Sequence, residues 1–124
     1  MAVQNGADLE MATRILNWYW HGQGLFQAFY AERDYSPEEV RLYSTNPPGA
    51  ECQVDIRDDG VSILSDYARL GGQQTVEDMA GSFPNNKPTI EQGSVVTCHL
   101  ITAGGAGDLN VQLEMDTIDD GVDL

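Results

Sequence analysis

Residues 52–65 read CQVDIRDDGVSILS, and this stretch decides the fold. Its first seven residues alternate apolar and polar side chains, which is typical of a strand with one buried face. The Asp59-Gly60 pair follows, and Asp-Gly between alternating segments predicts a tight hairpin turn, because that turn needs positive φ angles. The stretch therefore predicts a β-hairpin. Its core-facing residues are expected to be Val54, Ile56 and Ile63.

The acidic tip of this hairpin raises the question of whether it does chemistry. Alternation places Asp55 and Ser62 on the outer face of the hairpin, and Asp58 and Asp59 lie at the turn. Aspartate is favoured in turns because its short side chain bonds to nearby backbone groups. We therefore interpret the tip as a corner of a β-scaffold, and only weakly as a cation site.

Three other stretches also follow the period of a strand. Residues 95–101 carry apolar or β-branched side chains on both faces, which predicts a central strand. Residues 36–45 and 109–115 predict further strands, whereas residues 66–87 predict a loop with one or two short strands. In the last strand the residues expected on one face are Leu109, Val111, Leu113 and Met115.

The N-terminal third of the chain allows two interpretations. It can be a helix from Asp8 that breaks at two glycines, or two strands over residues 13–21 and 25–33 joined by a Gln-Gly turn. Aromatic residues favour strands, and two glycines within three residues suit a turn better than a helix interior. We therefore expect strands from about Arg14 onward.

These patterns together predict an all-β fold, a single antiparallel β-sandwich or jelly roll. A chain of 124 residues fits one domain, so we expect one sandwich over residues 1–124. Residues 1–12 are expected to form an irregular or short helical lead, and residues 118–124 an acidic tail.

Charge is the strongest signal in the composition. The chain has twenty acidic and six basic residues, its net charge is −14, and Lys87 is the only lysine. Such a surface repels a phosphate backbone, which argues against a nucleic-acid partner. Abundant aspartate and scarce lysine favour a protein adapted to high salt, where screening weakens self-repulsion. The alternatives are an acidic mimic of nucleic acid and an ordinary acidic protein.

Membrane insertion is not expected either. No apolar run approaches the ~18 residues of a membrane span, and the first residues lack the basic start and apolar stretch of a signal peptide.

Two segments resemble a known module. Residues 38–64 combine a strand, a Pro-Pro-Gly corner at 47–49 and the hairpin, and residues 88–116 combine a strand, a glycine-rich turn and a closing strand. In this order and spacing they resemble a small β-sandwich module of tailed-virus structural proteins, found in tail fibres, fibre tips and capsid decorations. The likeness covers about residues 25–117. It implies a virion location and contacts with other virion proteins and with copies of the same chain.

Catalytic motifs are scarce. The chain has two histidines, His21 and His99, and contains no GxSxG, HExxH or P-loop motif. His99 lies in an expected strand and His21 before a glycine, so both are interpreted as structural. We expect neither enzymatic activity nor an organic cofactor.

An aromatic run over residues 17–30 provides the candidates for an interface or ligand site. Alternation places Trp18 and Trp20 on one face and Tyr19 on the other. Exposed rings of this kind stack on sugars, and the alternatives are core packing and a subunit contact. The candidates are Trp18, Tyr19, Trp20, Phe26 and Phe29.

Acidic residues near the C-terminus are weak metal candidates. Hard cations need several oxygen ligands, but the spacing is not that of an EF-hand loop, and a solvated tail is the simpler interpretation. A structural divalent cation is therefore only a weak expectation. The candidates are Asp116, Asp119, Asp120 and Asp123.

The two cysteines, Cys52 and Cys98, each lie in an apolar alternating run. Neither belongs to a metal-binding spacing, so we expect two buried thiols, reduced rather than paired. A disulfide stays open as the alternative.

The sequence thus predicts a non-enzymatic virion structural protein, a capsid decoration or turret or a tail or fibre component, from a virus of a halophilic host. It would act through multivalent contacts. The aromatic run predicts a cyclic homo-oligomer with that run at or beneath the contact, and the resemblance implies a trimer before a pentamer or hexamer. The second hypothesis is a carbohydrate-binding or host-receptor-binding module. The third is an acidic inhibitor that mimics nucleic acid.

Overall fold

The chain folds into two packed antiparallel sheets. The computed structural model describes residues 12–20, 28–44, 49–71, 76–77, 82–84, 87–105 and 108–118, and it contains no helix in these ranges. The strands are β1 Thr13–Trp20, β2 Phe29–Tyr30, β3 Tyr35–Ser44, β4 Cys52–Asp58, β5 Val61–Ser62, β6 Ala68–Leu70, β7 Val76–Glu77, β8 Val95–Thr102 and β9 Leu109–Thr117. The expected all-β class is confirmed.

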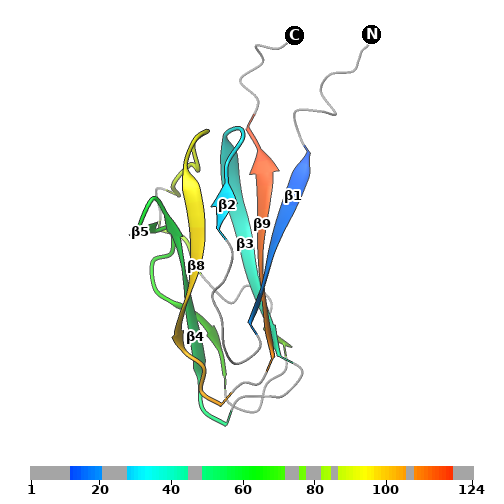
Figure 1. Ribbon diagram of the computed structural model, residues 1–124, viewed down its shortest axis with the longest axis vertical. Helices are drawn as coiled ribbons and strands as arrows, with labels where there is room; N and C mark the ends of the chain where they lie inside the picture. The colour runs from blue at the N-terminus through cyan, green and yellow to red at the C-terminus, as the bar shows by residue number, and fades with distance from the viewer. Residues whose placement is uncertain are drawn as a thin grey trace, which may run out of the picture.

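The strands pair in a nested order. The first described strand pairs with the last, β1 with β9, then β2 pairs with β8, β3 with β7, and β4 with both β5 and β6. Further pairs, β9 with β3 and β8 with β4, complete the sheet orders β1-β9-β3-β7 and β2-β8-β4-β5. This is the topology of a jelly roll, an antiparallel ribbon rolled into two layers (Figure 1).

The hairpin that the sequence predicted is present. Asp59 has φ 50° and Gly60 has φ 87°, so both turn residues adopt the positive φ of a primed two-residue turn. The returning strand is short, because only Val61 and Ser62 pair with β4. The prediction of a tight Asp-Gly turn is therefore confirmed.

The core lies between the sheets and follows the expected faces. All four inward residues of β9 are buried, and so are the three core-facing residues of the hairpin. These seven are Val54, Ile56, Ile63, Leu109, Val111, Leu113 and Met115. Alternation therefore identified the buried face of both segments correctly.

The strand interpretation of the N-terminal third is confirmed for residues 13–20, but the second predicted strand, over 25–33, is much shorter in the described residues, because residues 28 and 31–33 are not in a strand. β1 covers eight residues, but β2 covers only Phe29 and Tyr30, and residues 21–27 lie outside the described ranges. The two strands do not pair with each other, because β1 joins the sheet of β9 and β2 the sheet of β8. The expected lead over 1–12 and tail over 118–124 lie almost wholly outside the described residues.

Both cysteines are buried and unpaired, as expected. Burial raises the pKa of the Cys52 thiol to about 11, and burial also raises the pKa of Cys98. Each thiol is therefore a small apolar side chain of the core at neutral pH.

The glycine-rich connection from β8 to β9 is held by one close backbone approach. Gly104 has φ 61°, and its carbonyl accepts a hydrogen bond of 2.9 Å from the Ala50 amide. A β-carbon at Gly104 would lie 2.6 Å from the Glu51 carbonyl oxygen and would also overlap the Ala50 carbonyl. Only glycine fits here, because the obstructing atoms are backbone atoms that have no rotamer to change.

We expect Gly104→Ala to lower the free energy of unfolding by about 3 kcal/mol, because it adds a left-handed backbone penalty and a steric overlap. Gly60→Ala is the matched control: its φ is also positive, but nothing lies within 4 Å of the added β-carbon. The control should cost about 1 kcal/mol. Urea denaturation measures both, and equal losses would contradict the close approach.

Candidate functional site

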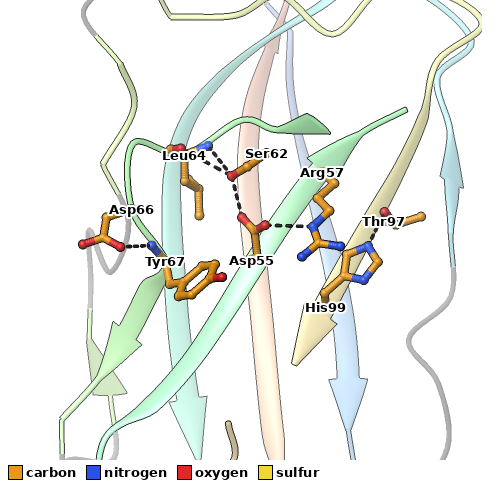
Figure 2. Close-up of polar contacts among 8 residues, drawn as sticks. All are labelled: Asp55, Arg57, Ser62, Leu64, Asp66, Tyr67, Thr97 and His99. Carbon is orange, nitrogen blue, oxygen red and sulfur yellow. Dashed lines mark hydrogen bonds and ion pairs between the residues drawn. The ribbon is translucent and has the colours of Figure 1, made fainter. Parts of the chain in front are cut away.

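A polar cluster lies on the outer face of β4 and β8, opposite the core. The two strands pair Asp55 with His99 and Arg57 with Thr97, so four polar side chains lie on adjacent strands. Ser62 of β5 joins them across the hairpin (Figure 2). Aspartate, histidine and serine are types of residue that acid–base or nucleophilic chemistry uses.

Asp55 is buried, which corrects the expectation of an exposed outer-face residue. Its exposed fraction is only 2%, although its side chain points away from the core side of β4. The carboxylate accepts a hydrogen bond of 2.5 Å from the Ser62 hydroxyl and one of 2.9 Å from Arg57 Nε. A buried carboxylate needs such partners, and here both of its oxygens have one.

The burial follows from the way β5 and β6 share one edge of β4. β5 pairs with the end of β4 and β6 with its start, so Asp55 lies opposite the connection between them. Ser62 begins that connection, and its hydroxyl oxygen accepts a hydrogen bond of 3.2 Å from the Leu64 amide. Asp55 therefore ties the connection to the sheet through Ser62, as Figure 2 shows.

His99 is part of a second polar pair on the same face. Its Nε2 atom lies 2.8 Å from Thr97 Oγ1. Burial lowers the pKa of His99, the Arg57 charge lowers it further, and the Asp55 charge opposes both. The imidazole is therefore neutral at pH 7. This fits the expectation of a structural histidine in a strand.

Serine, histidine and aspartate meet here, but their connections are not those of a nucleophilic site. Such a site needs the hydroxyl bonded to the imidazole, and the imidazole oriented by the carboxylate. The hydroxyl of Ser62 instead donates to Asp55, whereas His99 bonds Thr97. The cluster stabilises a loop, and its contacts assemble no proton relay.

The acidic tip serves the hairpin turn, as the sequence indicated. Asp59 Oδ1 accepts a hydrogen bond of 2.9 Å from the Val95 amide, and the Asp59 amide donates to the Val95 carbonyl at 2.9 Å. Asp58 differs, because its buried Oδ1 atom has no hydrogen-bond partner. Burial raises the pKa of Asp58, the charges of Asp59 and Glu91 raise it further, and a hydrogen bond from Ser94 opposes them.

The aromatic candidates are divided between core and surface. Trp18 is only 4% exposed and belongs to the core, and Trp20 and Phe29 pack against that core half-buried. Tyr19 points outward and is 61% exposed, so the alternation of this strand was predicted correctly. Phe26 lies outside the described residues. A sugar cannot stack on the Trp18 ring in this structure.

The metal candidates are not brought together in the described part of the chain. Asp116 is half-buried and accepts a hydrogen bond of 3.1 Å from Thr13 Oγ1. Asp119, Asp120 and Asp123 lie outside the described ranges, so a cation in the tail stays a prediction. Among the described residues, no group of three or more acidic, histidine or cysteine side chains is placed to hold a metal ion. Nor do these residues include a helix that could span a membrane.

Sequence reasoning missed the burial of Asp55. A strict two-residue period marks it as solvent-facing, and nothing in the period reports a loop that folds over the polar face. The sequence did contain a signal. Asp55 and Arg57 lie two residues apart on one strand face, and a tight turn brings Ser62 opposite Arg57, so the three form a cross-strand polar set.

Comparisons with known proteins support the fold. No protein-family model matches the sequence, and no curated protein matches it. Among solved structures, a chain from the acidic stable capsid structure of Helicobacter pylori bacteriophage KHP30 is similar, with a TM-score of 0.55 and 10% sequence identity. The alignment covers 89% of this chain and 91% of that one. At this identity the likeness shows a shared fold.

We expect Asp55→Ala to lower the free energy of unfolding by about 2–3 kcal/mol, because it leaves Ser62 and the half-buried Arg57 without their shared acceptor. Glu51→Ala is the control, since it removes an exposed carboxylate that pairs with Arg69 at 2.7 Å. The control should change stability much less. Thermal unfolding decides, and similar losses in both variants would exclude a structural role for the buried carboxylate.

Asp58→Asn should stabilise the protein at neutral pH. The pKa of Asp58 is raised above the ordinary 3.8, so ionisation costs stability as the pH rises through the folded value. The amide removes this cost, which we put at about 0.5 kcal/mol, or about 2 °C in Tm, because water still screens this half-exposed group. The gain should disappear below about pH 3.8, where the carboxyl is protonated in both states.

Asp66→Asn is the control, because the pKa of Asp66 is shifted in the opposite direction to that of Asp58. The pKa of Asp66 is lowered by the hydrogen bond from the Tyr67 amide and by Arg69. Its amide variant should therefore be no more stable than the wild type at neutral pH. An equal gain in both variants would show that only net charge matters.

Proposed function

We propose that the chain is a non-enzymatic structural component of a virus particle. The observation that carries this proposal is the match of nearly the whole chain to a chain of a phage capsid structure, with 89% and 91% of the two chains aligned. Because the two shares are almost equal, the two chains have similar lengths. The likeness therefore extends over nearly all of both aligned chains.

The architecture of the described residues supports the same role. The polar contacts of the Asp55 cluster hold a connection in place, and they form no relay for catalysis. A rigid sandwich with polar outer faces suits a protein that acts by shape and by repeated contacts. The partners we propose are other virion proteins and copies of the same chain.

A place on the outside of the capsid fits better than a place in the tail. The neighbouring structure is a capsid, and a chain of 124 residues is small enough to decorate a shell built by larger proteins. The strong negative charge keeps free copies apart in solution before they bind the particle. The salt-adapted host that the charge suggests stays a prediction, which a rise of Tm with added NaCl would support.

The test is made on particles of the virus that encodes the chain. We expect quantitative mass spectrometry of gradient-purified particles to find the chain in a fixed ratio to the major shell protein. Particles that lack its gene should bind the recombinant chain up to the same ratio, whereas thermally unfolded chain should not bind. A chain that is abundant in infected cells but absent from purified particles would overturn the proposal.

A further inference from the structure

β1 is the longest strand at a sheet edge in the described part of the chain. It lies at the end of the order β1-β9-β3-β7, and Figure 1 shows it in blue at the margin, with β9 on one side. It has eight residues, whereas the remaining edge strands β2, β5, β6 and β7 have two or three. Short edge strands are a common protection against unwanted pairing, and β1 lacks that protection.

The ladder with β9 shows which backbone groups face the open side. The Thr117 amide donates to the Ala12 carbonyl at 2.8 Å, and Asn110 Nδ2 donates to the Trp18 carbonyl at 3.2 Å. The even-numbered residues thus direct their backbone groups toward β9. Hydrogen-bonded and non-hydrogen-bonded pairs alternate in an antiparallel ladder, so the amides and carbonyls of Thr13, Ile15 and Asn17 point away from the sheet.

The residues of β1 leave this edge open to pairing. The strand contains no proline, lysine or acid, and its register with β9 runs without a bulge from Thr13 to Trp20. Proline, lysine, acidic residues and bulges are the features that commonly protect an edge strand from pairing with another chain. Its one charged residue, Arg14, is already paired with Glu32 at 2.8 Å. In a chain of net charge −14, β1 is therefore a strand without acids.

We propose that β1 pairs with β1 of a second copy, antiparallel across a two-fold axis at Ile15, so that two four-stranded sheets join into one. In this register Ile15 faces Ile15 of the second copy, and Thr13 faces Asn17 on either side. Opposite residues of an antiparallel pair lie on the same face, so the outer faces of the two sheets stay continuous. Each of the three pairs exchanges two backbone hydrogen bonds, and all six groups per copy are those that point outward.

Charge favours a second copy over another partner. A basic partner would be attracted to the acidic surface elsewhere, whereas β1 itself carries no acid, so two copies that meet along β1 place no carboxylates of this strand opposite each other. Ile15 is 46% exposed, and covering it adds an apolar contact at the centre of the pair. The inference rests on the proposed function, because binding to a particle would supply the high local concentration that brings copies together.

The inference also changes the expected symmetry. The aromatic run predicts a cyclic homo-oligomer with Trp18, Trp20, Phe26 and Phe29 at or beneath the contact, and the resemblance implies a trimer first. Trp18 is a core residue, so we place the contact between copies at the backbone edge of the same strand and not at those rings. Two identical strands that pair antiparallel form an isologous contact, which closes as a dimer.

The test compares two lysine substitutions by sedimentation equilibrium in molar NaCl, where repulsion between copies is screened. Ile15→Lys places like charges opposite each other at the axis. Tyr43→Lys is the matched control, because Tyr43 is 47% exposed on the same sheet but lies on β3, two strands from the edge. We expect a dimeric wild type, a dimeric Tyr43→Lys, and a dimer Kd raised about tenfold or more in Ile15→Lys.

A second variant separates pairing from side-chain charge. Asn17→Pro removes an amide that points away from β9, so the fold should survive, as circular dichroism would show, while the dimer weakens. A monomeric wild type at high concentration in both low and molar salt overturns the inference. So does a dimer that Ile15→Lys leaves intact, or equal loss in both lysine variants. A particle map with another virion protein on β1 overturns the second copy but leaves the virion role standing.

Discussion

Pairing of β1 with β9 is the interaction that closes this fold. β9 lies between β1 and β3 over its whole length, and its inward-facing residues are all buried and form much of the core on that sheet. The other strand pairs are nested inside this one, so β1 and β9 are the paired strands that lie farthest apart in the sequence. Such pairing links residues about a hundred positions apart, and its loop-closure cost is repaid only when both layers of the core form.

The same closure creates the open edge on which assembly would depend. A rolled ribbon buries its inner strands, but among the described strands β1 has only β9 beside it in the sheet. The other described edge strands have two or three residues, so β1 is the longest of them and long enough for stable pairing. A small acidic protein with one such edge can repel its copies in dilute solution and still pair with them when crowded on a particle.

The polar cluster on the other sheet has a mechanical role. Asp55 holds the connection between β5 and β6 through Ser62, and Arg57 balances its charge. A buried ion pair contributes less net stability than its contacts suggest, because desolvation of both groups opposes it. Its value here is specificity: it selects one path for a loop that would otherwise lie loosely over the sheet.

The sequence by itself determined the strands, the faces and the turn at Asp59-Gly60. Those properties depend on neighbours within a few residues: a two-residue period marks the buried face, and positive φ at the turn favours glycine, asparagine or aspartate. Tertiary structure alone decided the burial of Asp55 and of Trp18 and the separation of β1 and β2 into different sheets. Each depends on a segment distant in sequence. The β5–β6 connection buries Asp55, the opposite layer buries Trp18, and pairing with β9 and β8 separates β1 from β2. No local pattern encodes such contacts, because they arise when the ribbon rolls and distant surfaces meet.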